Sequence, residues 1–174
     1  MASSSFEDQA YRIKALSAVL IKLARRDFEK RLNDGKLGVT PLGAVVVQIL
    51  SHHQMTLSDL GHHLMLASAT LIPVVDSLEK SGLVKRNADP SDRRRAPLSL
   101  TPKGKRLNKK IPFVDAKDLL VVSLGKLGEE KTEQLASLLE EMALYMSRNP
   151  FIGDNIRMAL QEKKEKNGRE NRDG

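Results

Sequence analysis

The sequence predicts a mainly α-helical fold with one small β-hairpin. Apolar residues recur at helical spacing before Leu83 and again after Thr101. Between Leu83 and Leu100 the spacing changes to the alternation that is typical of strands. The segment from Lys85 to Lys110 is also strongly basic, with ten lysines and arginines against two aspartates. Such a local basic segment is typical of a protein that binds a polyanion, and a solvated basic face is the alternative.

Composition excludes several classes of protein. The 174 residues contain no cysteine, which excludes disulfide frameworks, thiolate zinc sites and cysteine redox sensing. The N-terminal segment lacks the apolar core of a signal peptide, and no apolar run approaches the length of a membrane span, about 20 residues. We therefore expect a cytoplasmic protein with no membrane partner.

The first part of the chain predicts two helices. Apolar side chains form one stripe over residues 10–32, the pattern of a long amphipathic helix. The glycine-containing segment 33–38 ends it. Thr40 then supplies an N-cap and Pro41 the first residue of a second helix, which continues through about Ser51 and is apolar enough to be buried.

The next two helices are short and closely spaced. Residues 57–64 predict the first and residues 65–67 a turn. Ser68 is predicted to cap a further helix over 69–81, and Gly82 is placed as the residue that follows its C-cap. Two helices joined by so short a turn form a helix-turn-helix, a pattern that other helical hairpins share.

A charged hairpin follows directly. Residues 83–86 and 96–100 predict two strands, and residues 87–95 predict the loop between them. The order helix, turn, helix and hairpin is that of a winged helix-turn-helix, in which the hairpin loop is the wing.

The remainder of the chain predicts two further helices and a tail. Thr101-Pro102 repeats the cap-plus-proline signal and predicts a long helix to about Leu124, with Gly125 and Gly128 interrupting the pattern. A last amphipathic helix is predicted over 129–147. From Gln161 onward no residue is apolar, which predicts a disordered tail.

The helix at 69–81 is the candidate for reading DNA in the major groove, because residues near the N-terminus of such a helix contact base edges. It offers few of the Arg, Asn or Gln side chains that bind guanine or adenine bidentately. We therefore expect readout through hydroxyl groups and through apolar contacts with thymine methyl groups. The alternative is that this helix only packs against the core. The candidate residues are Ser68, Ala69, Thr70, Ile72, Pro73 and Ser77.

Three adjacent arginines, Arg93, Arg94 and Arg95, occupy the predicted wing, whose tip cannot bury three guanidinium groups. Arginines there suit insertion into a narrow minor groove, where the potential is most negative. Asp92 is predicted to hold a neighbouring arginine in a fixed geometry, and a simple turn-forming role is the alternative. Lys103, at the start of the next helix, is expected to contact phosphates unless it belongs only to a solvated face.

Two histidine pairs raise a metal-binding alternative. Adjacent residues on a helix point about 100° apart, so neither His52-His53 nor His62-His63 can chelate a metal by itself. We expect no cofactor, and a metal-responsive regulator that uses these histidines is kept as an alternative. No nucleophile elbow, phosphate-binding loop or paired-carboxylate arrangement stands out, so we do not expect an enzyme.

Four stretches of the sequence resemble the MarR family of bacterial and archaeal regulators. The most specific part is D-P-x-D-R-R in the predicted wing, followed by L-T-x-x-G, and the resemblance covers about residues 11–146. The four stretches are Leu37–Pro41, Leu78–Arg86, Asp89–Arg94 and Leu100–Gly104.

The resemblance implies a homodimer that binds double-stranded DNA at a pseudo-palindromic operator, usually as a repressor. It implies that Arg94 enters the minor groove and that Asp92 or Asp89 supports it. Many members release DNA when a small, often phenolic or lipophilic compound enters a pocket between two regions, and we assign no residue to such an effector. The implied regions are dimerisation helices at 1–35 and 102–148, a DNA-binding region at 36–101 and a polar tail at 149–174.

The chain departs from the family at Ile72-Pro73, where members commonly carry a polar or basic residue. This departure shifts the expected source of specificity towards the wing. The lack of cysteine also separates the chain from the family's peroxide sensors. We predict a sequence-specific DNA-binding transcription regulator, with a non-sequence-specific architectural or RNA-binding protein as the alternative.

Overall fold

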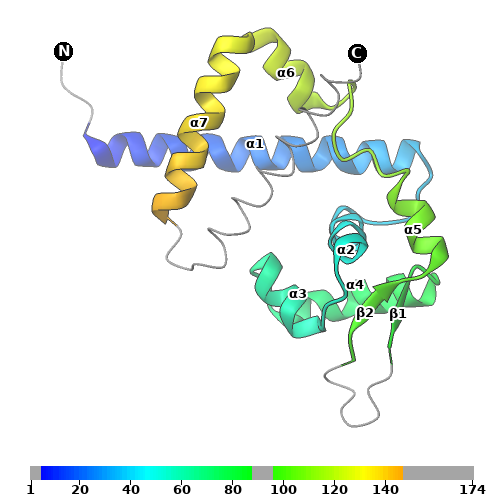
Figure 1. Cartoon of the computed structure of the whole chain (residues 1–174). Helices are drawn as coiled ribbons and strands as arrows, with labels where there is room; N and C mark the ends of the chain where they lie inside the picture. The colour runs from blue at the N-terminus through cyan, green and yellow to red at the C-terminus, as the bar shows by residue number, and fades with distance from the viewer. Residues whose placement is uncertain (1–4, 88–95, 147–174) are drawn as a thin grey trace, which may run out of the picture. The chain divides into compact units, whose positions relative to one another are not determined.

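The computed structural model describes residues 5–87 and 96–146 of the chain. These residues form helices and a two-stranded antiparallel sheet (Figure 1), in agreement with the predicted fold class. The chain divides into two compact units, residues 1–122 and 123–174. The elements are α1 (Phe6–Asp34), α2 (Pro41–His52), α3 (Leu57–Leu64), α4 (Ser68–Lys80), β1 (Val84–Arg86), β2 (Leu98–Leu100), α5 (Pro102–Asn108), α6 (Leu119–Leu127) and α7 (Glu129–Met146).

Two threonine–proline pairs begin helices as predicted. The hydroxyl of Thr40 accepts a hydrogen bond from the N–H of Gly43 (3.1 Å), and Pro41 opens α2. The hydroxyl of Thr101 accepts from the N–H of Gly104 (3.1 Å) in the same way at α5. Each bond satisfies a backbone donor that has no partner within the first turn of its helix. The predicted starts of these two helices are therefore confirmed.

The start of α4 differs from the prediction and its end agrees. Ala67 is the N-cap and Ser68 is already helical, so the predicted capping role of Ser68 is wrong. The left-handed turn at Met65 (φ 53°) lets the chain re-enter helical geometry one residue early. After α4, the N–H groups of Gly82 (φ 68°) and Leu83 donate to carbonyls of the last turn at 2.8 and 2.9 Å, a Schellman arrangement.

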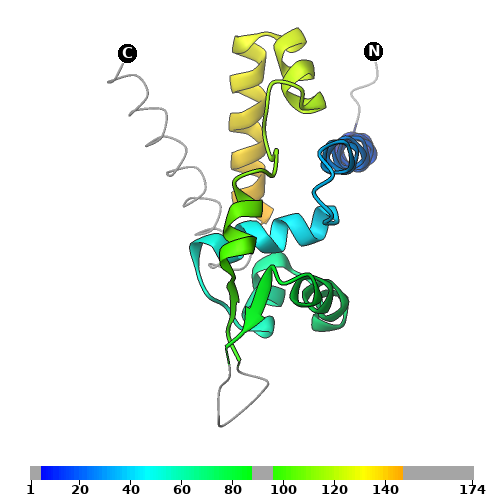
Figure 2. The ribbon, with the colours of Figure 1, turned by 90° about the vertical axis from the view of Figure 1, so that its right-hand side faces the viewer.

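The hairpin lies beside the helix-turn-helix and continues into α5 (Figure 2). Val84 pairs with Leu100 and Arg86 pairs with Leu98. A further bridge joins Met55 to Leu98 through backbone hydrogen bonds of 3.3 and 2.7 Å, which the sequence did not predict. The turn between α2 and α3 is thereby attached to the base of the hairpin.

The core of the first unit lies between α2, α3, α4 and the hairpin. Leu60 and Leu98 are fully buried there, and Leu32 at the end of α1 packs against the same cluster. Because α4 buries Leu71, Val75 and Leu78 on one side, its opposite side faces outward.

The predicted long helix from Pro102 to Leu124 is wrong in its middle. α5 ends at Asn108 and α6 begins at Leu119. Pro112 explains the interruption, because proline has no N–H and disfavours helical geometry in the residue before it. α6 runs through Gly125, so no interruption occurs at that residue, whereas Gly128 (φ 89°) separates α6 from α7.

Gly104 of the L-T-x-x-G stretch lies against the backbone of the hairpin. A Cβ atom at this position would be 2.1 Å from the carbonyl oxygen of Leu83. We expect Gly104→Ala to lower the free energy of unfolding by about 1–3 kcal/mol, the range for overpacking a filled site. Urea denaturation followed by circular dichroism measures this change. The matched control is Gly125→Ala, where the new Cβ has no atom within 4 Å; an equal loss there would contradict the steric explanation.

Candidate nucleic-acid interface

The outward side of α4 carries the residues that the sequence proposed for base reading. Ser68, Ala69 and Thr70 in the first turn are exposed, as are Ile72, Pro73 and Ser77 further along. Pro73 is accommodated within the helix, although it cannot donate to the carbonyl four residues before it. The structure therefore places all six side chains on accessible parts of one helix.

An arginine that sequence reasoning missed connects α4 to the hairpin. The Nη2 atom of Arg86 on β1 lies 2.6 Å from a carboxylate oxygen of Asp76, and its Nε lies 3.1 Å from Glu79. The two acids are three residues apart on α4 and therefore share one side of the helix. This spacing of the two acids is the signal in the sequence that could have indicated a basic partner for them. Arg86 holds the hairpin against α4, and its single positive charge is shared between the two carboxylates of this helix.

The base of the wing is held by polar contacts. The side-chain amide of Asn87 donates to the hydroxyl of Ser99 and to the side-chain carbonyl of Gln54, each at 3.2 Å. The wing residues themselves, namely Asp89, Asp92, Arg93, Arg94 and Arg95, lie outside the described residues. Their roles stay predictions.

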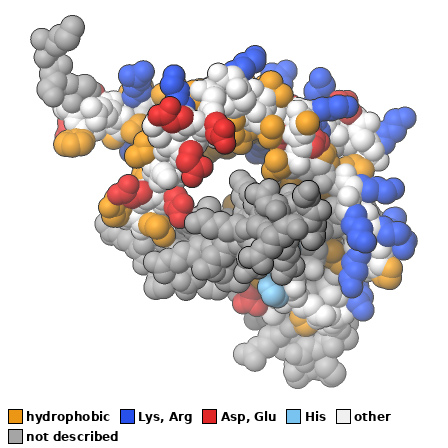
Figure 3. All heavy atoms as spheres, turned by 45° about the horizontal axis from the view of Figure 1, so that its top comes forward, with side chains coloured by type: hydrophobic (Ala, Val, Ile, Leu, Met, Phe, Trp, Pro, Cys, Tyr) orange, Lys and Arg blue, Asp and Glu red, His pale blue; other side chains and the backbone are white. Residues whose placement is uncertain are grey.

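Lys103 lies in a basic groove beside the hairpin. Its ammonium group donates to the carbonyl of Ser81, at the C-terminal end of α4, at 2.8 Å. The groove has a volume of about 500 Å³, and Lys36, Arg106 and Lys110 line it together with Lys103 and several leucines. Lysine and arginine side chains gather along one side of the face drawn in Figure 3. None of the groove's described lining residues is acidic, so it presents uncompensated positive charge.

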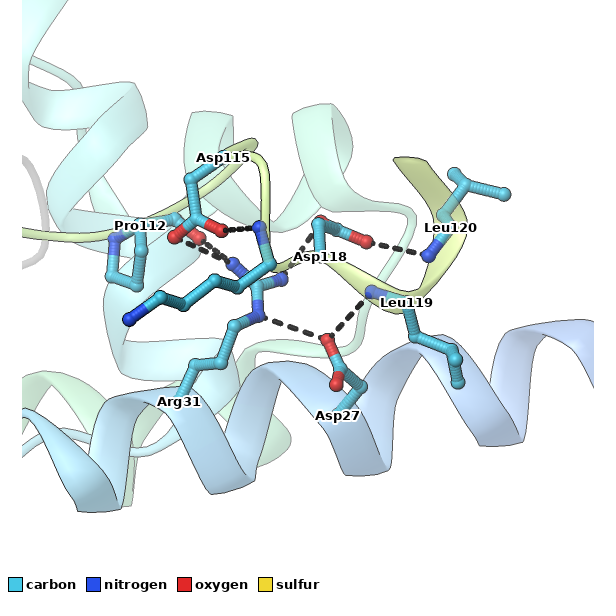
Figure 4. Close-up of polar contacts among 8 residues, drawn as sticks. Asp27, Arg31, Pro112, Asp115, Asp118, Leu119 and Leu120 are labelled. Carbon is cyan, nitrogen blue, oxygen red and sulfur yellow. Dashed lines mark hydrogen bonds and ion pairs between the residues drawn. The ribbon is translucent and has the colours of Figure 1, made fainter. Parts of the chain in front are cut away.

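Arg31 on α1 is the centre of a nearly buried ion cluster (Figure 4). Its Nε and Nη2 atoms donate to Asp27 at 2.9 Å and to Asp118 at 2.7 Å, and Nη1 lies 3.5 Å from Asp115. Nη1 also donates to the carbonyl of Pro112. Only 12% of the Arg31 side chain is exposed. The cluster attaches the segment between α5 and α6 to α1, a contact between residues far apart in sequence that no motif indicated.

An apolar cleft of about 680 Å³ lies next to this cluster. The rings of Phe28 and Phe113 line it, with their centroids 5.5 Å apart. α2 contributes Leu42 and Val45, and Thr70 of α4 reaches its edge. A molecule in this cleft would touch both α1 and the helix proposed to read DNA.

Large apolar side chains remain exposed along α1. Leu16 is 52% exposed and Leu20 is 60% exposed, and they lie one turn apart on the same side of the helix. These apolar side chains can be removed from water only if another protein surface packs against this side of α1. The exposed apolar residues of α1 are Phe6, Tyr11, Ile13, Leu16, Val19, Leu20, Ile21 and Leu23.

The histidines provide no support for a metal site. His52 ends α2, and His62 and His63 lie in the last turn of α3. Within residues 5–87 and 96–146, no three His, Asp or Glu side chains are grouped so that they could hold a metal ion. In the same residues no helix is long and apolar enough to cross a membrane.

Sequence comparison finds that the chain is similar to a family model and to transcriptional regulators. A model of the MarR family matches residues 41–96. The chain is 30% identical over 129 residues to the HTH-type transcriptional regulator MhqR of Bacillus subtilis (strain 168), covering 72% of this chain and 88% of that protein. It is 30% identical over 105 residues to the organic hydroperoxide resistance transcriptional regulator of the same organism, covering 60% and 69%.

Two solved DNA complexes have the same fold. A mutant of MarR from E. coli bound to operator DNA superposes with a TM-score of 0.67 at 20% identity, covering 80% of this chain and 99% of that one. The S. aureus MepR–DNA complex superposes with a TM-score of 0.65 at 23% identity, covering 76% and 97%.

Proposed function

Because this chain belongs to the MarR family of transcription regulators, we propose that it binds a pseudo-palindromic operator in duplex DNA as a homodimer and represses transcription there. One observation carries the proposal: the exposed side of α4 is followed directly by a hairpin whose loop holds Arg93, Arg94 and Arg95. A helix of this kind enters the major groove, and arginines of a wing enter the flanking minor groove. Arg86 joins α4 to β1, the strand that leads into this loop.

In this proposal the wing supplies much of the affinity. We expect Arg94→Ala to weaken operator binding by about 1–3 kcal/mol, the range for a specific arginine contact. A gel-shift titration at fixed salt measures the change, and size-exclusion chromatography checks that the variant assembles as the wild type does. Lys131→Ala on α7 removes an exposed positive charge outside the proposed DNA-binding region and serves as the control. Equal affinities for Arg94→Ala and wild type would rule out this role of Arg94.

Sequence specificity distinguishes a transcription regulator from the alternative function. A regulator favours its operator over bulk duplex DNA by orders of magnitude, whereas an architectural or RNA-binding protein that uses the same basic segment does not. Competition of the labelled operator with bulk DNA and with RNA therefore tests the proposal. Equal competition by all three nucleic acids would overturn it.

The apolar cleft between α1, α2 and α4 is the proposed site of a small-molecule effector. Its lining is mainly aromatic and aliphatic, with Arg25, Arg31 and Asp118 as its charged residues, and suits a largely apolar compound. The 174 residues contain no cysteine, so a response based on cysteine oxidation is not available to them. Release of the operator by members of a panel of phenolic and lipophilic compounds would support this role.

A further inference from the structure

One exposed side of the first two turns of α4 is apolar. Ala69, Ile72 and Pro73 are spaced i, i+3 and i+4, which places them together on one side of the helix, and all three are exposed. Ile72 keeps 43% of its surface accessible. None of the three side chains carries a hydrogen-bonding group. We call these residues the apolar reading face.

Hydroxyl groups of the helix lie to either side of this face. Ser68 is directed towards α3, because its Oγ would be 3.9 Å from a Cβ atom placed on Gly61. Thr70 lines the apolar cleft, and Ser77 lines a notch beside the start of α2 to which Pro73 also contributes. Ser68 and Thr70 are thus directed towards neighbouring parts of the protein, which favours apolar contact over hydroxyl contact in the first turns of α4.

The next polar group along the same side of α4 is already engaged. Asp76 follows Ile72 and Pro73 by one turn, and the guanidinium of Arg86 binds its carboxylate at 2.6 Å. Arg86 also binds Glu79 at 3.1 Å, so its single positive charge is shared between the two acids. The apolar reading face is therefore bordered by a carboxylate that is bound within the protein, and not by an unbound group that would select a polar base edge.

We infer that α4 recognises thymine, through burial of the thymine C5-methyl group against Ala69, Ile72 and Pro73. Thymine is the base that presents a methyl group in the major groove, whereas the other bases present polar edges there. Placing those polar edges against an apolar surface removes their hydrogen bonds to water without replacing them. The apolar reading face thus favours thymine and disfavours the other three bases. This inference rests on the proposed function, since it requires α4 to lie in the major groove.

Replacing thymine by uracil tests the inference, because uracil keeps the pairing edge and lacks only the methyl group. The operator is first obtained by selecting bound duplexes from a random library with the wild-type protein. Each thymine of the half-site is then replaced by uracil, and affinities are measured at fixed salt. We expect a loss of about fourfold for each methyl group that contacts the face, the equivalent of burying one methylene-sized group.

Two variants assign the effect to the reading face. Ile72→Ala and Pro73→Ala remove apolar atoms from exposed positions, and Pro73→Ala restores a backbone donor, so both are expected to fold. The wild type should bind the thymine duplex more tightly than the uracil duplex at a contacted position. At that position, at least one of the two variants should bind both duplexes with equal affinity. Ser77→Ala is the control on the same helix and should retain the full uracil penalty.

Each outcome decides a different claim. If the wild type selects a sequence but binds its uracil form as tightly as its thymine form, the inference is wrong and the proposed function stands. If Ser77→Ala alone removes the uracil penalty, the methyl group contacts Ser77 and not the apolar reading face, and the inference is wrong. If no sequence is enriched from the library, the proposed function fails and the inference fails with it.

Discussion

An Arg31→Met variant is expected to lose about 3–5 kcal/mol of unfolding free energy, the range for breaking a buried ion pair. The guanidinium of Arg31 is the shared partner of Asp27, Asp115 and Asp118. Asp27 and Asp118 keep 20% and 12% of their side chains exposed, so the lost partner is not fully replaced by water. Urea denaturation followed by circular dichroism measures the loss.

Two further variants make the Arg31 result specific. Arg31→Lys keeps the charge but cannot reproduce the planar fork that reaches several acceptors at once, so an intermediate loss is expected. Arg26→Met removes an exposed arginine from the same helix and should leave the unfolding free energy nearly unchanged. If Arg31→Met were as stable as Arg26→Met, the ion cluster would not hold the segment after α5 to α1.

The double variant Leu16→Glu/Leu20→Glu is expected to be monomeric and to lose operator binding. Both leucines are more than half exposed on α1, and the proposed dimer buries this side of the helix. Two charges placed there could be buried only at a large cost. A dimer binds the second half-site intramolecularly, whereas two monomers bind the half-sites as separate molecules. The affinity for the full operator should therefore fall by about 10²–10⁴-fold.

Sedimentation equilibrium and gel-shift titration measure the two effects together. Lys22→Glu is the control, since this residue is exposed and lies about 200° around the helix from Leu20. It introduces the same negative charge on the other side of α1. A double variant that stayed dimeric would show that this side of α1 is not the dimer surface, and the exposed leucines of α7 would be the next to test.

Signals that act within a few residues were read correctly from the sequence. Thr40-Pro41 and Thr101-Pro102 begin helices because the threonine hydroxyl and the N–H that it accepts from are three residues apart. Gly82 ends α4 because a positive φ at that position is easy only for glycine. The strands flanking the wing follow from the change in apolar spacing, which reflects the side-chain period of a strand.

Two local predictions are wrong about where a helix begins or ends. Ser68 has the right chemistry for an N-cap, but the left-handed turn at Met65 starts the helix one residue sooner. The helix predicted to continue to Leu124 contains Pro112, which α5 cannot accommodate. Pro112 is a signal in the sequence, whereas the turn at Met65 is not, because residues with a Cβ atom rarely adopt a positive φ.

The sequence by itself determined the order of elements, the basic segment and the residues available on α4. Only the tertiary structure decided how those residues are used. Arg31 meets acids 84 and 87 residues away, and Arg86 meets two acids on α4. The direction of each side chain on α4 likewise depends on where its neighbours pack. Such contacts join residues that only the folded chain brings together, so no local spacing encodes them.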